Sequence, residues 1–179
     1  MFPSHWTTER TRIDNVRPEE AASLAVLFTS SSDIARFDPT FHPVDEAEVL
    51  TLIEESRHSE AQAQGFRMQA MRLRRTDDLI GYLHFREATP QPDVVGLTMF
   101  VIRPEFRSNG YGHEIADALI GHLSRDPMNR AVWARVYLKN TPALRFWIGR
   151  GFTQVVQHRG RHVHVEGEHT SVILERVLS

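Results

Sequence analysis

The sequence predicts an α/β fold in which a central mixed sheet is flanked by helices. Segments with the composition of strands alternate with segments of helical periodicity along the 179 residues. The segment Val94 to Ile102 is nearly all apolar, as expected of a strand that is covered on both faces. A Gly-rich loop, a helix and a second apolar strand, Ala131 to Tyr137, follow it in that order. These observations favour one compact domain spanning residues 1–179.

The first half of the chain is expected to contain three strands and two helices. Two acidic residues, Glu19 and Glu20, favour a helix that starts at Pro18 and ends at Ser30. A second, more polar helix is expected over Asp45 to Ser59. The residues 76–78 (Thr-Asp-Asp) predict a tight turn between two strands. The strands expected here run over Thr8 to Asn15, Gln69 to Arg75 and Leu79 to Arg86, and Ser31 to Pro43 is expected to form a loop.

The second half is expected to continue the alternation around the apolar strand. Two prolines mark the segment from Glu87 to Asp93 as a loop. An apolar stripe at helical spacing predicts a helix over Tyr111 to Leu123. Two further strands are expected after Phe152, with Gly160 and Gly167 at turns.

The composition narrows the classes of function. Hydrophobic residues make up 41% and charged residues 25% of the chain, which is ordinary for a globular enzyme. The net charge of −2 and the pI of about 6.5 argue against nucleic acid as the main partner. The absence of cysteine excludes disulfides, a thiolate nucleophile and Cys-bound metal. No apolar run has the length of a membrane span, and no signal-peptide pattern opens the chain, so a cytoplasmic location without membrane attachment is expected.

Histidines near the C-terminus raise the question of a metal site. His162 and His164 would point to the same side of a strand, and Glu166 and His169 lie close by in sequence. The segment has, however, the pattern of a polar edge hairpin with charges on both sides. A solvated strand face is therefore the preferred interpretation, and no metal is expected.

The loop after the central strand has the features of a phosphate-binding loop. Gly110 and Gly112 let the backbone turn its N–H groups inward with no Cβ in the way. The amides at the start of the following helix add a partial positive charge, and Arg107 supplies a forked cation suited to phosphate oxygens. No Gly-Lys-Ser/Thr of a P-loop follows, and the third glycine of a dinucleotide motif is missing. The loop alone could also be an ordinary turn, and its context decides in favour of a pyrophosphate.

A second motif follows the strand Ala131 to Tyr137. Asn140 lies at the strand end and can cap a helix that Pro142 begins. Gly151 is suited to end that helix at the C′ position.

The two motifs together resemble a known family. The chain contains, in order, a strand, Pro-x-x-Arg-x-x-Gly-x-Gly, a helix, a strand and Asn-x-x-Ala-x-x-Phe-aromatic-x-x-x-Gly-Phe. This order and separation resemble the Gcn5-related N-acetyltransferase (GNAT) family. The residues 6–13 and 166–178 also resemble the two ends of the ribosomal-protein alanine N-acetyltransferase (Rim-type) subgroup.

The resemblance implies an enzyme that moves an acetyl group from the co-substrate acetyl-CoA to a primary amine by direct attack on the thioester. It implies that the central strand splays from its neighbour, so that the pantetheine arm pairs with the strand while the Gly-rich loop holds the pyrophosphate. A backbone N–H near Ile102 would stabilise the oxyanion. The cofactor-binding residues implied are Phe100, Val101, Ile102, Arg107, Ser108, Asn109, Gly110, Tyr111, Gly112, Asn140 and Phe146.

The general base is not fixed by the motifs. The family often has a Glu near the start of the central strand, where this chain has Val94. Asp93 is one residue earlier, on the opposite face unless a bulge intervenes. His84 and Glu87 on the preceding strand are the alternatives.

The general acid is equally open. Many family members have a Tyr after the Phe of the second motif, and this chain has Trp147, whose indole cannot give up its proton at physiological pH. Either the thiolate leaves without an acid, or Tyr137 protonates it.

The acceptor site is expected to be bordered by the polar loop Ser31 to Pro43 and the helix after it. Asp38, Asp45 and Glu46 make this region acidic, which would favour a cationic amine. A protein N-terminus, an antibiotic amine, a polyamine and an amino acid remain open, as do a longer acyl group, a non-catalytic acyl-CoA-binding role and a homodimer.

Overall fold

The computed structural model describes residues 2–39, 41–61, 65–164 and 167–178, and of residues 61, 157–164 and 167–169 it describes the backbone alone. Eight strands form one sheet in the order β1-β2-β3-β4-β5-β6-β8-β7. Neighbouring strands are antiparallel except for β5 and β6, which are parallel, so the expected mixed sheet is confirmed. The strands are β1 His5–Thr7, β2 Thr11–Asn15, β3 Gly65–Leu73, β4 Leu79–Glu87, β5 Val94–Ile102, β6 Ala131–Tyr137, β7 Gln154–His164 and β8 Gly167–Val177.

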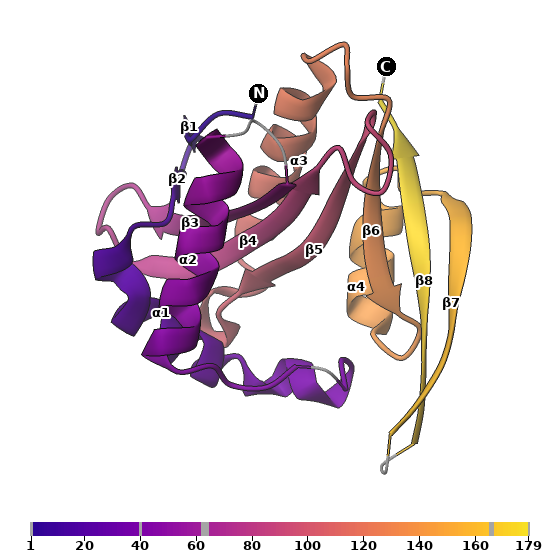
Figure 1. Cartoon of the computed structure of the whole chain (residues 1–179), viewed down its shortest axis with the longest axis horizontal. Helices are drawn as coiled ribbons and strands as arrows, with labels where there is room; N and C mark the ends of the chain where they lie inside the picture. The colour runs from indigo at the N-terminus through magenta and orange to yellow at the C-terminus, as the bar shows by residue number, and fades with distance from the viewer. Residues whose placement is uncertain (1, 40, 62–64, 165–166, 179) are drawn as a thin grey trace.

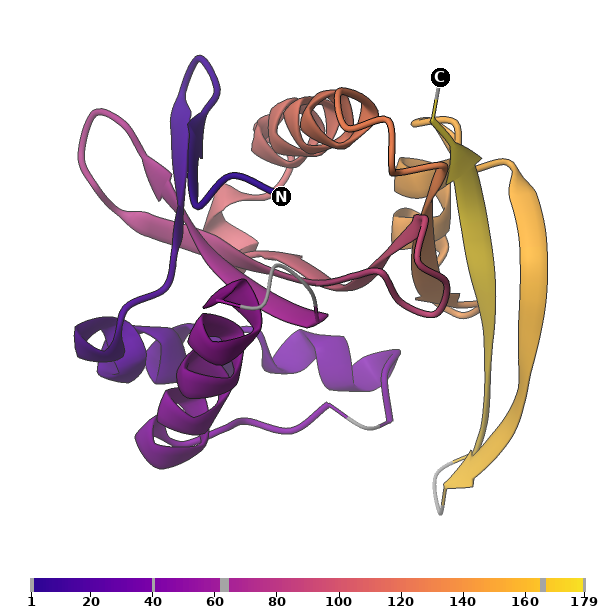
Figure 2. The same ribbon diagram turned by 45° about the horizontal axis from the view of Figure 1, so that its top comes forward.

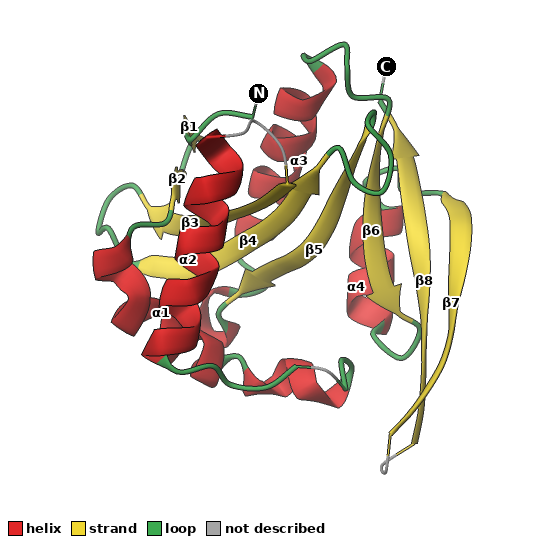
Figure 3. Cartoon of the chain, viewed as in Figure 1, coloured by secondary structure: helices red, strands yellow, loops and turns green. Residues whose placement is uncertain are grey.

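The helices cover both faces of this sheet (Figures 1 and 3). The turned view in Figure 2 shows which helices lie on each face. The helices are α1 Ala21–Ser30 and α2 Glu46–Ala61 on the first face, and α3 Tyr111–Ser124 and α4 Thr141–Ile148 on the second. Among the helices that the structure describes, none combines the length and the apolar character of a membrane span.

Two hydrophobic cores correspond to the two faces. Leu24, Ile53 and Tyr82 represent the core between α1, α2 and the sheet. Leu119 and Trp147 represent the larger core beneath α3 and α4. Because both faces of β5 are covered, its sequence is nearly all apolar and carries no alternation.

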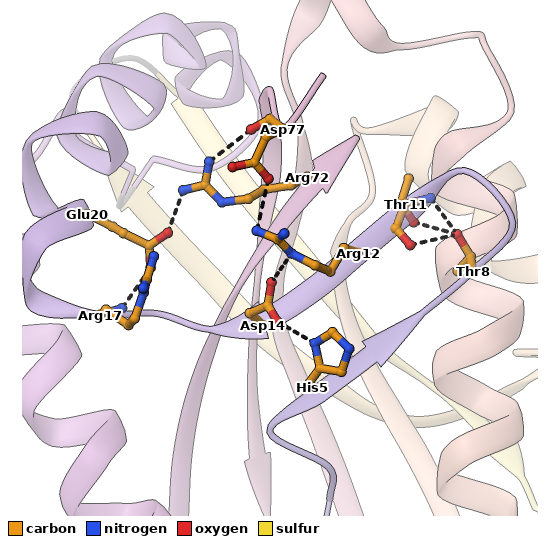
Figure 4. Close-up of polar contacts among 9 residues, drawn as sticks. All are labelled: His5, Thr8, Thr11, Arg12, Asp14, Arg17, Glu20, Arg72 and Asp77. Atoms are coloured by element: carbon orange, nitrogen blue, oxygen red, sulfur yellow. Dashed lines mark hydrogen bonds and ion pairs between the residues drawn. The ribbon is translucent and has the colours of Figure 1, made fainter. Parts of the chain in front are cut away.

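The structure corrects three expectations about the strands. Thr8 and Thr11 exchange hydrogen bonds in a tight turn, so Thr8 to Arg10 join β1 to β2, and the strand expected from Thr8 begins at Thr11 (Figure 4). β3 begins at Gly65, four residues before the expected Gln69. The sequence does not reveal this start, because both faces of β3 are buried and the alternation that marks a strand is missing. Gly160 lies inside β7 and not at a turn.

The segment expected to be a loop, Ser31 to Pro43, contains a short 3-10 helix, η2 Ser32–Arg36. It leaves α1 and crosses below the sheet toward β6 in Figure 1. Two further 3-10 turns, η1 Pro18–Glu20 and η3 Pro104–Phe106, precede α1 and α3.

Ion pairs hold the N-terminal hairpin to the rest of the sheet (Figure 4). Arg12 donates to Asp14 at 2.6 Å and lies 2.9 Å from Asp77 in the β3–β4 turn. Arg72 donates to Glu20 at 2.5 Å and thereby connects β3 to η1. The Arg12 pairs are substantially exposed, so each contributes little stability, and of the two only the pair with Asp77 reaches beyond β2.

At Gly81 the backbones of β4 and β5 approach each other closely. A Cβ at this position would lie 2.2 Å from the carbonyl oxygen of Val101. We therefore expect Gly81→Ala to lower the free energy of unfolding by about 1–3 kcal/mol, measured by urea denaturation. Gly121 in α3 is the matched control, because a Cβ added there would meet no atom within 4 Å beyond the backbone of its own helix. Gly121→Ala should raise stability by about 0.5–1 kcal/mol, and equal effects of the two substitutions would contradict the steric argument.

Candidate active site

A cleft opens where β5 and β6 separate. Their parallel register runs only from Val94 and Ala131 to Leu97 and Ala134, after which the strands diverge toward their carboxyl ends (Figure 1). The cleft has a volume of about 140 Å³. Its walls come from the second halves of β5 and β6, the start of α4, and the residues in and after η2.

A β-bulge in β5 shapes one wall of this cleft. In the ladder with β4, Leu97 pairs with Phe85 and Met99 pairs with His84, which leaves Thr98 as an extra residue. The extra residue changes the phase of the alternation. As a result, Phe100 faces the α3 and α4 side, as Leu97 does, and packs edge-on against Trp147 with ring centroids 5.4 Å apart.

The Gly-rich loop lies at the end of β5 and opens into α3. Ser108 and Gly110 both have positive φ, of 62° and 82°, so the backbone folds back on itself before the helix. Gly110 is the N-cap of α3, and because it has no side chain, it cannot satisfy the free N–H groups of the first turn. Such amides, together with the helix dipole, bind anions.

Arg107 is positioned differently from the expectation. Its Nε donates to the carbonyl oxygen of Ile102 at 2.7 Å. Its Nη1 and Nη2 donate to the two carboxylate oxygens of Asp33 in η2, at 2.5 and 3.1 Å. The cation that was expected to face phosphate is thus paired with a carboxylate of η2, next to the cleft-lining Ile34.

Arg10, in the turn between β1 and β2, is a second cation at this loop and was missed by the sequence analysis. Its Nε donates to Glu114 at 2.6 Å, and its Nη1 donates to the carbonyl oxygen of Asn109 at 3.0 Å. The guanidinium also lies 4.5 Å from the ring centroid of Tyr111. Burial opposes ionisation of Glu114, but hydrogen bonds from Thr8 and Arg10 outweigh it and lower the pKa of that carboxyl.

The second motif forms the far wall of the cleft. The Asn140 side chain accepts a hydrogen bond from the backbone N–H of Ala143 at 3.1 Å, so the expected helix cap is confirmed. Gly151 has a φ of 80° and follows α4 in a bonded turn, as expected of a C′ glycine. Asn140, Tyr137 and Trp147 all line the cleft. Phe146 stacks beside Phe100 at 5.7 Å.

The residues considered as general base do not meet at the cleft. Asp93 lies at the far end of β5 and accepts from Arg130 at 2.9 Å. Glu87 accepts from Arg67 at 2.8 Å and from the backbone N–H of Phe2 at 3.1 Å. Neither is among the residues that line the cleft.

His84 is buried on the other face of the sheet. Its ring lies among those of Phe28, Phe66 and Tyr82, and its Nε2 has no hydrogen-bond partner within the described residues. Burial, with a smaller effect of the Arg86 charge, lowers the pKa of His84 to about 3. An imidazole of this kind stays neutral at physiological pH and is a poor proton acceptor, so the structure does not support it as the base.

Of the three acidic residues expected near the acceptor, one lines the cleft. Asp38 is 9% exposed and lies in the wall together with Ile34 and Phe37. Asp45 and Glu46 are exposed at the start of α2, outside the cleft wall. Asp45 and Glu48 there accept hydrogen bonds from each other's backbone N–H, at 2.9 and 3.0 Å.

The histidines considered as metal ligands lie outside the described side chains. This holds for His162, His164 and His169, and Glu166 lies outside the described residues altogether. Within the part of the chain whose side chains are described, no three His, Asp or Glu residues are grouped in a way that would hold a metal ion.

A splayed pair of parallel strands beside an amide-rich loop is the arrangement of a protein that binds an extended, phosphate-bearing ligand along an open strand edge. The family comparison agrees: a family model described as "Acetyltransferase (GNAT) domain" matches residues 10–153. The chain therefore belongs to the GNAT acetyltransferase family, and the expected class, an acetyl-CoA-dependent N-acetyltransferase, is that of this family. Among curated protein sequences, no relative matches significantly.

Solved structures share the fold over nearly the whole chain. Ribosomal-protein-S5-alanine acetyltransferase from Vibrio fischeri has a TM-score of 0.81 at 9% identity, covering 98% of this chain and 97% of that one. RimL, a ribosomal L7/L12 acetyltransferase in complex with coenzyme A, has a TM-score of 0.78 at 13% identity, with coverage of 99% and 97%. The protein yncA from Salmonella typhimurium, with acetyl-CoA, has a TM-score of 0.71 at 15% identity and covers 94% of each chain. The resemblance to Rim-type enzymes is thus confirmed at the level of the fold.

The depressed pKa of His84 predicts an acid-sensitive stability. Because the folded imidazole has a pKa near 3 and the unfolded one about 6.5, the unfolded state binds the extra proton between these values. The contribution of neutral His84 is therefore complete above about pH 6.5 and is lost as the pH falls toward 3. We expect His84→Leu to flatten the fall of Tm with pH in this window and to keep most of kcat. The same substitution at the exposed His58 should leave the pH profile unchanged, and a large loss of kcat in His84→Leu with an intact fold would contradict our interpretation.

Proposed function

We propose that this chain, as one domain over residues 1–179, transfers the acetyl group of acetyl-CoA to the primary amine of a cationic acceptor. The observation that carries the proposal is the end of the β5–β6 register at Leu97 and Ala134, in a strand whose carboxyl end leads into the Gly-rich loop. This geometry leaves an unpaired strand edge and an anion-binding backbone on one continuous path. Acetyl-CoA has the matching parts, an amide-bearing arm and a pyrophosphate.

Acetyl-CoA would lie with its pyrophosphate on the amides of Asn109 to Gly112. Its pantetheine arm would extend along the edge of β5 at Phe100 to Ile102, where β6 no longer provides partners. Asn140 and Phe146, at the opposite wall, would contact the arm near its thioester.

The acceptor would enter from the side of η2. Asp38 is the carboxylate among the described residues that line the cleft, and it lies in a wall otherwise made by the apolar side chains of Ile34 and Phe37. A largely buried carboxylate there would bind an ammonium group and take up its proton. The neutral nitrogen then attacks the thioester carbon, the carbon–sulfur bond breaks, and the sulfur leaves as a thiolate. The nitrogen gives up its second proton to water as the amide forms.

Two routes exist for the leaving thiolate. Its thiol has an ordinary pKa of about 8.5, so it can leave unprotonated. The hydroxyl of Tyr137, which lies in the cleft wall, can also donate a proton to it. Trp147 packs between Phe100, Phe146 and Phe152, which is a packing role.

An amine-panel assay that detects the released CoA thiol tests the proposal. The panel should contain a peptide with a free N-terminus, because two of the structural neighbours act on ribosomal proteins, together with a polyamine, an aminoglycoside and an amino acid. Asp38→Asn should raise the KM of a cationic acceptor on the order of tenfold, because it removes a charged partner from a desolvated site. Glu46→Gln is the control outside the wall and should leave KM unchanged. No thiol release with any amine, while CoA still binds, would favour a non-catalytic binding module.

Substitutions at Trp147 separate packing from proton transfer. We expect Trp147→Phe to keep most of kcat, because the aromatic contacts remain, and Trp147→Ala to lose activity through lost packing. Removing a general acid or base typically costs on the order of 100- to 10,000-fold. Tyr137→Phe, assayed alongside, reports whether that hydroxyl protonates the thiolate. A drop of that size in Trp147→Phe, with unchanged folding and CoA affinity, would show that the indole N–H acts in the transition state.

A further inference from the structure

The ion pair of Arg107 and Asp33 connects two parts of the cleft that are distant in sequence. One partner lies in the Gly-rich loop and the other in η2, with a sequence separation of 74 residues. The pair is bidentate, with both carboxylate oxygens of Asp33 accepting from the guanidinium. The third contact of Arg107, to the carbonyl oxygen of Ile102, fixes the guanidinium at the end of β5. A planar guanidinium held at three points is a rigid connection between the strand end and η2.

Asp33 is joined to the acceptor wall by short backbone bonds. Ile34, immediately after Asp33, accepts from the backbone N–H groups of Phe37 and Asp38, both at 2.9 Å. Ile34, Phe37 and Asp38 are the residues of this segment that line the cleft. A displacement of Asp33 therefore moves the carboxylate and the apolar side chains that would face the amine.

The Gly-rich loop retains its means of binding an anion without Arg107. The free amides of the first turn of α3 remain, and the guanidinium of Arg10 lies over the same loop, with Nη2 3.2 Å from the point that a Cβ would occupy at Gly110. Arg10 is also bound to the carbonyl oxygen of Asn109, so it both shapes the loop and places a positive charge beside it.

We propose that Arg107 and Asp33 form a latch that positions the acceptor wall, and that Arg107 acts as a positioning residue for the amine rather than as the main pyrophosphate ligand. This inference rests on the proposed function, in which the amine enters beside Asp38. The motif alone would make Arg107 a pyrophosphate ligand, and this role and the latch predict different effects of an Asp33 substitution on CoA binding. If Arg107 served phosphate, neutralising Asp33 would free the guanidinium and strengthen CoA binding. In a latch, the same change loosens the acceptor wall and leaves CoA binding nearly unchanged.

The experiment measures CoA affinity by calorimetric titration, hydrogen exchange of the backbone amides of residues 33–38, and the separate KM values of amine and acetyl-CoA. The variants are Asp33→Asn, Arg107→Ala and the charge-swapped double variant Asp33→Arg with Arg107→Asp. Glu55→Gln is the matched control, because the Arg86–Glu55 pair is similarly exposed and joins α2 to β4 outside the cleft wall. Gly110→Val is the reference for a damaged loop, since its φ of 82° disfavours any side chain.

The latch predicts that Asp33→Asn and Arg107→Ala each speed exchange of residues 33–38 and raise the amine KM by about fivefold, the size expected for loss of a half-exposed ion pair. CoA affinity should change by less than about twofold in both, whereas Gly110→Val should lose it. The swapped variant should restore slow exchange, because the pair reforms with inverted charges.

Two results would overturn the latch. One is a CoA affinity at least about tenfold weaker in Arg107→Ala, which is the loss expected for a charge-assisted phosphate contact. The other is unchanged exchange of residues 33–38 in Asp33→Asn. Exchange and CoA binding are measured without turnover, so they test the latch even if none of the amines is acetylated. Conversely, if an amine is acetylated but hydrogen exchange of residues 33–38 is unchanged in Asp33→Asn, the proposed function stands and the latch alone is contradicted.

Discussion

The site depends on the short register between β5 and β6. A parallel pair is held only as far as its ladder of hydrogen bonds continues, and here the ladder ends at Leu97 and Ala134. Beyond that point, the β5 backbone groups that face the gap have to bind water or a ligand, since unpaired buried backbone groups are costly. The bulge at Thr98, the start of α4 and the residues after η2 all surround this gap. Without the divergence, the same residues would form a closed sheet with no place for a thioester.

The Gly-rich loop is held from two sides by ion pairs that reach distant parts of the chain. Arg10 and Glu114 connect it to the N-terminal hairpin, and Arg107 and Asp33 connect it to η2. Both pairs are partly exposed, so salt should weaken both. These distant pairs add to the local hydrogen bonds of a loop that folds back on itself with positive φ at Ser108 and Gly110. Its geometry therefore depends on its neighbours as much as on its glycines.

Local patterns predicted most of the elements around the site. The bounds of β5 and β6 were predicted to the residue, because long apolar runs with clear ends identify buried strands. The Asn140 cap and the Gly151 turn were predicted from residue types that have one common structural use. The predicted start of β3 was wrong, because burial on both faces removes the alternation on which the prediction relies.

The contacts that matter for chemistry were less predictable. Arg10 meets Glu114 across 104 residues, and no local pattern records such a pair. The proposed base candidates near β5 were chosen by sequence position, whereas the sheet places Asp93 at the end away from the cleft and buries His84 on the opposite face. The direction of a side chain on a bulged strand, and the partner of an arginine, are decided by tertiary packing.

The bulge at Thr98 has a consequence for how variation in β5 will act. Along an unbroken strand, positions two apart share a face, so a changed side chain alters packing on one side of the sheet only. In β5 this rule holds on each side of Thr98 and fails across it: Leu97 and Phe100 belong to one core, Met99 and Val101 to the other. Deleting Thr98 would restore regular alternation, because Leu97 and Met99 already pair with neighbouring residues of β4, and each remaining side chain would keep its face. The bulge therefore gives β5 one position at which the strand can lose a residue while both layers keep their side chains.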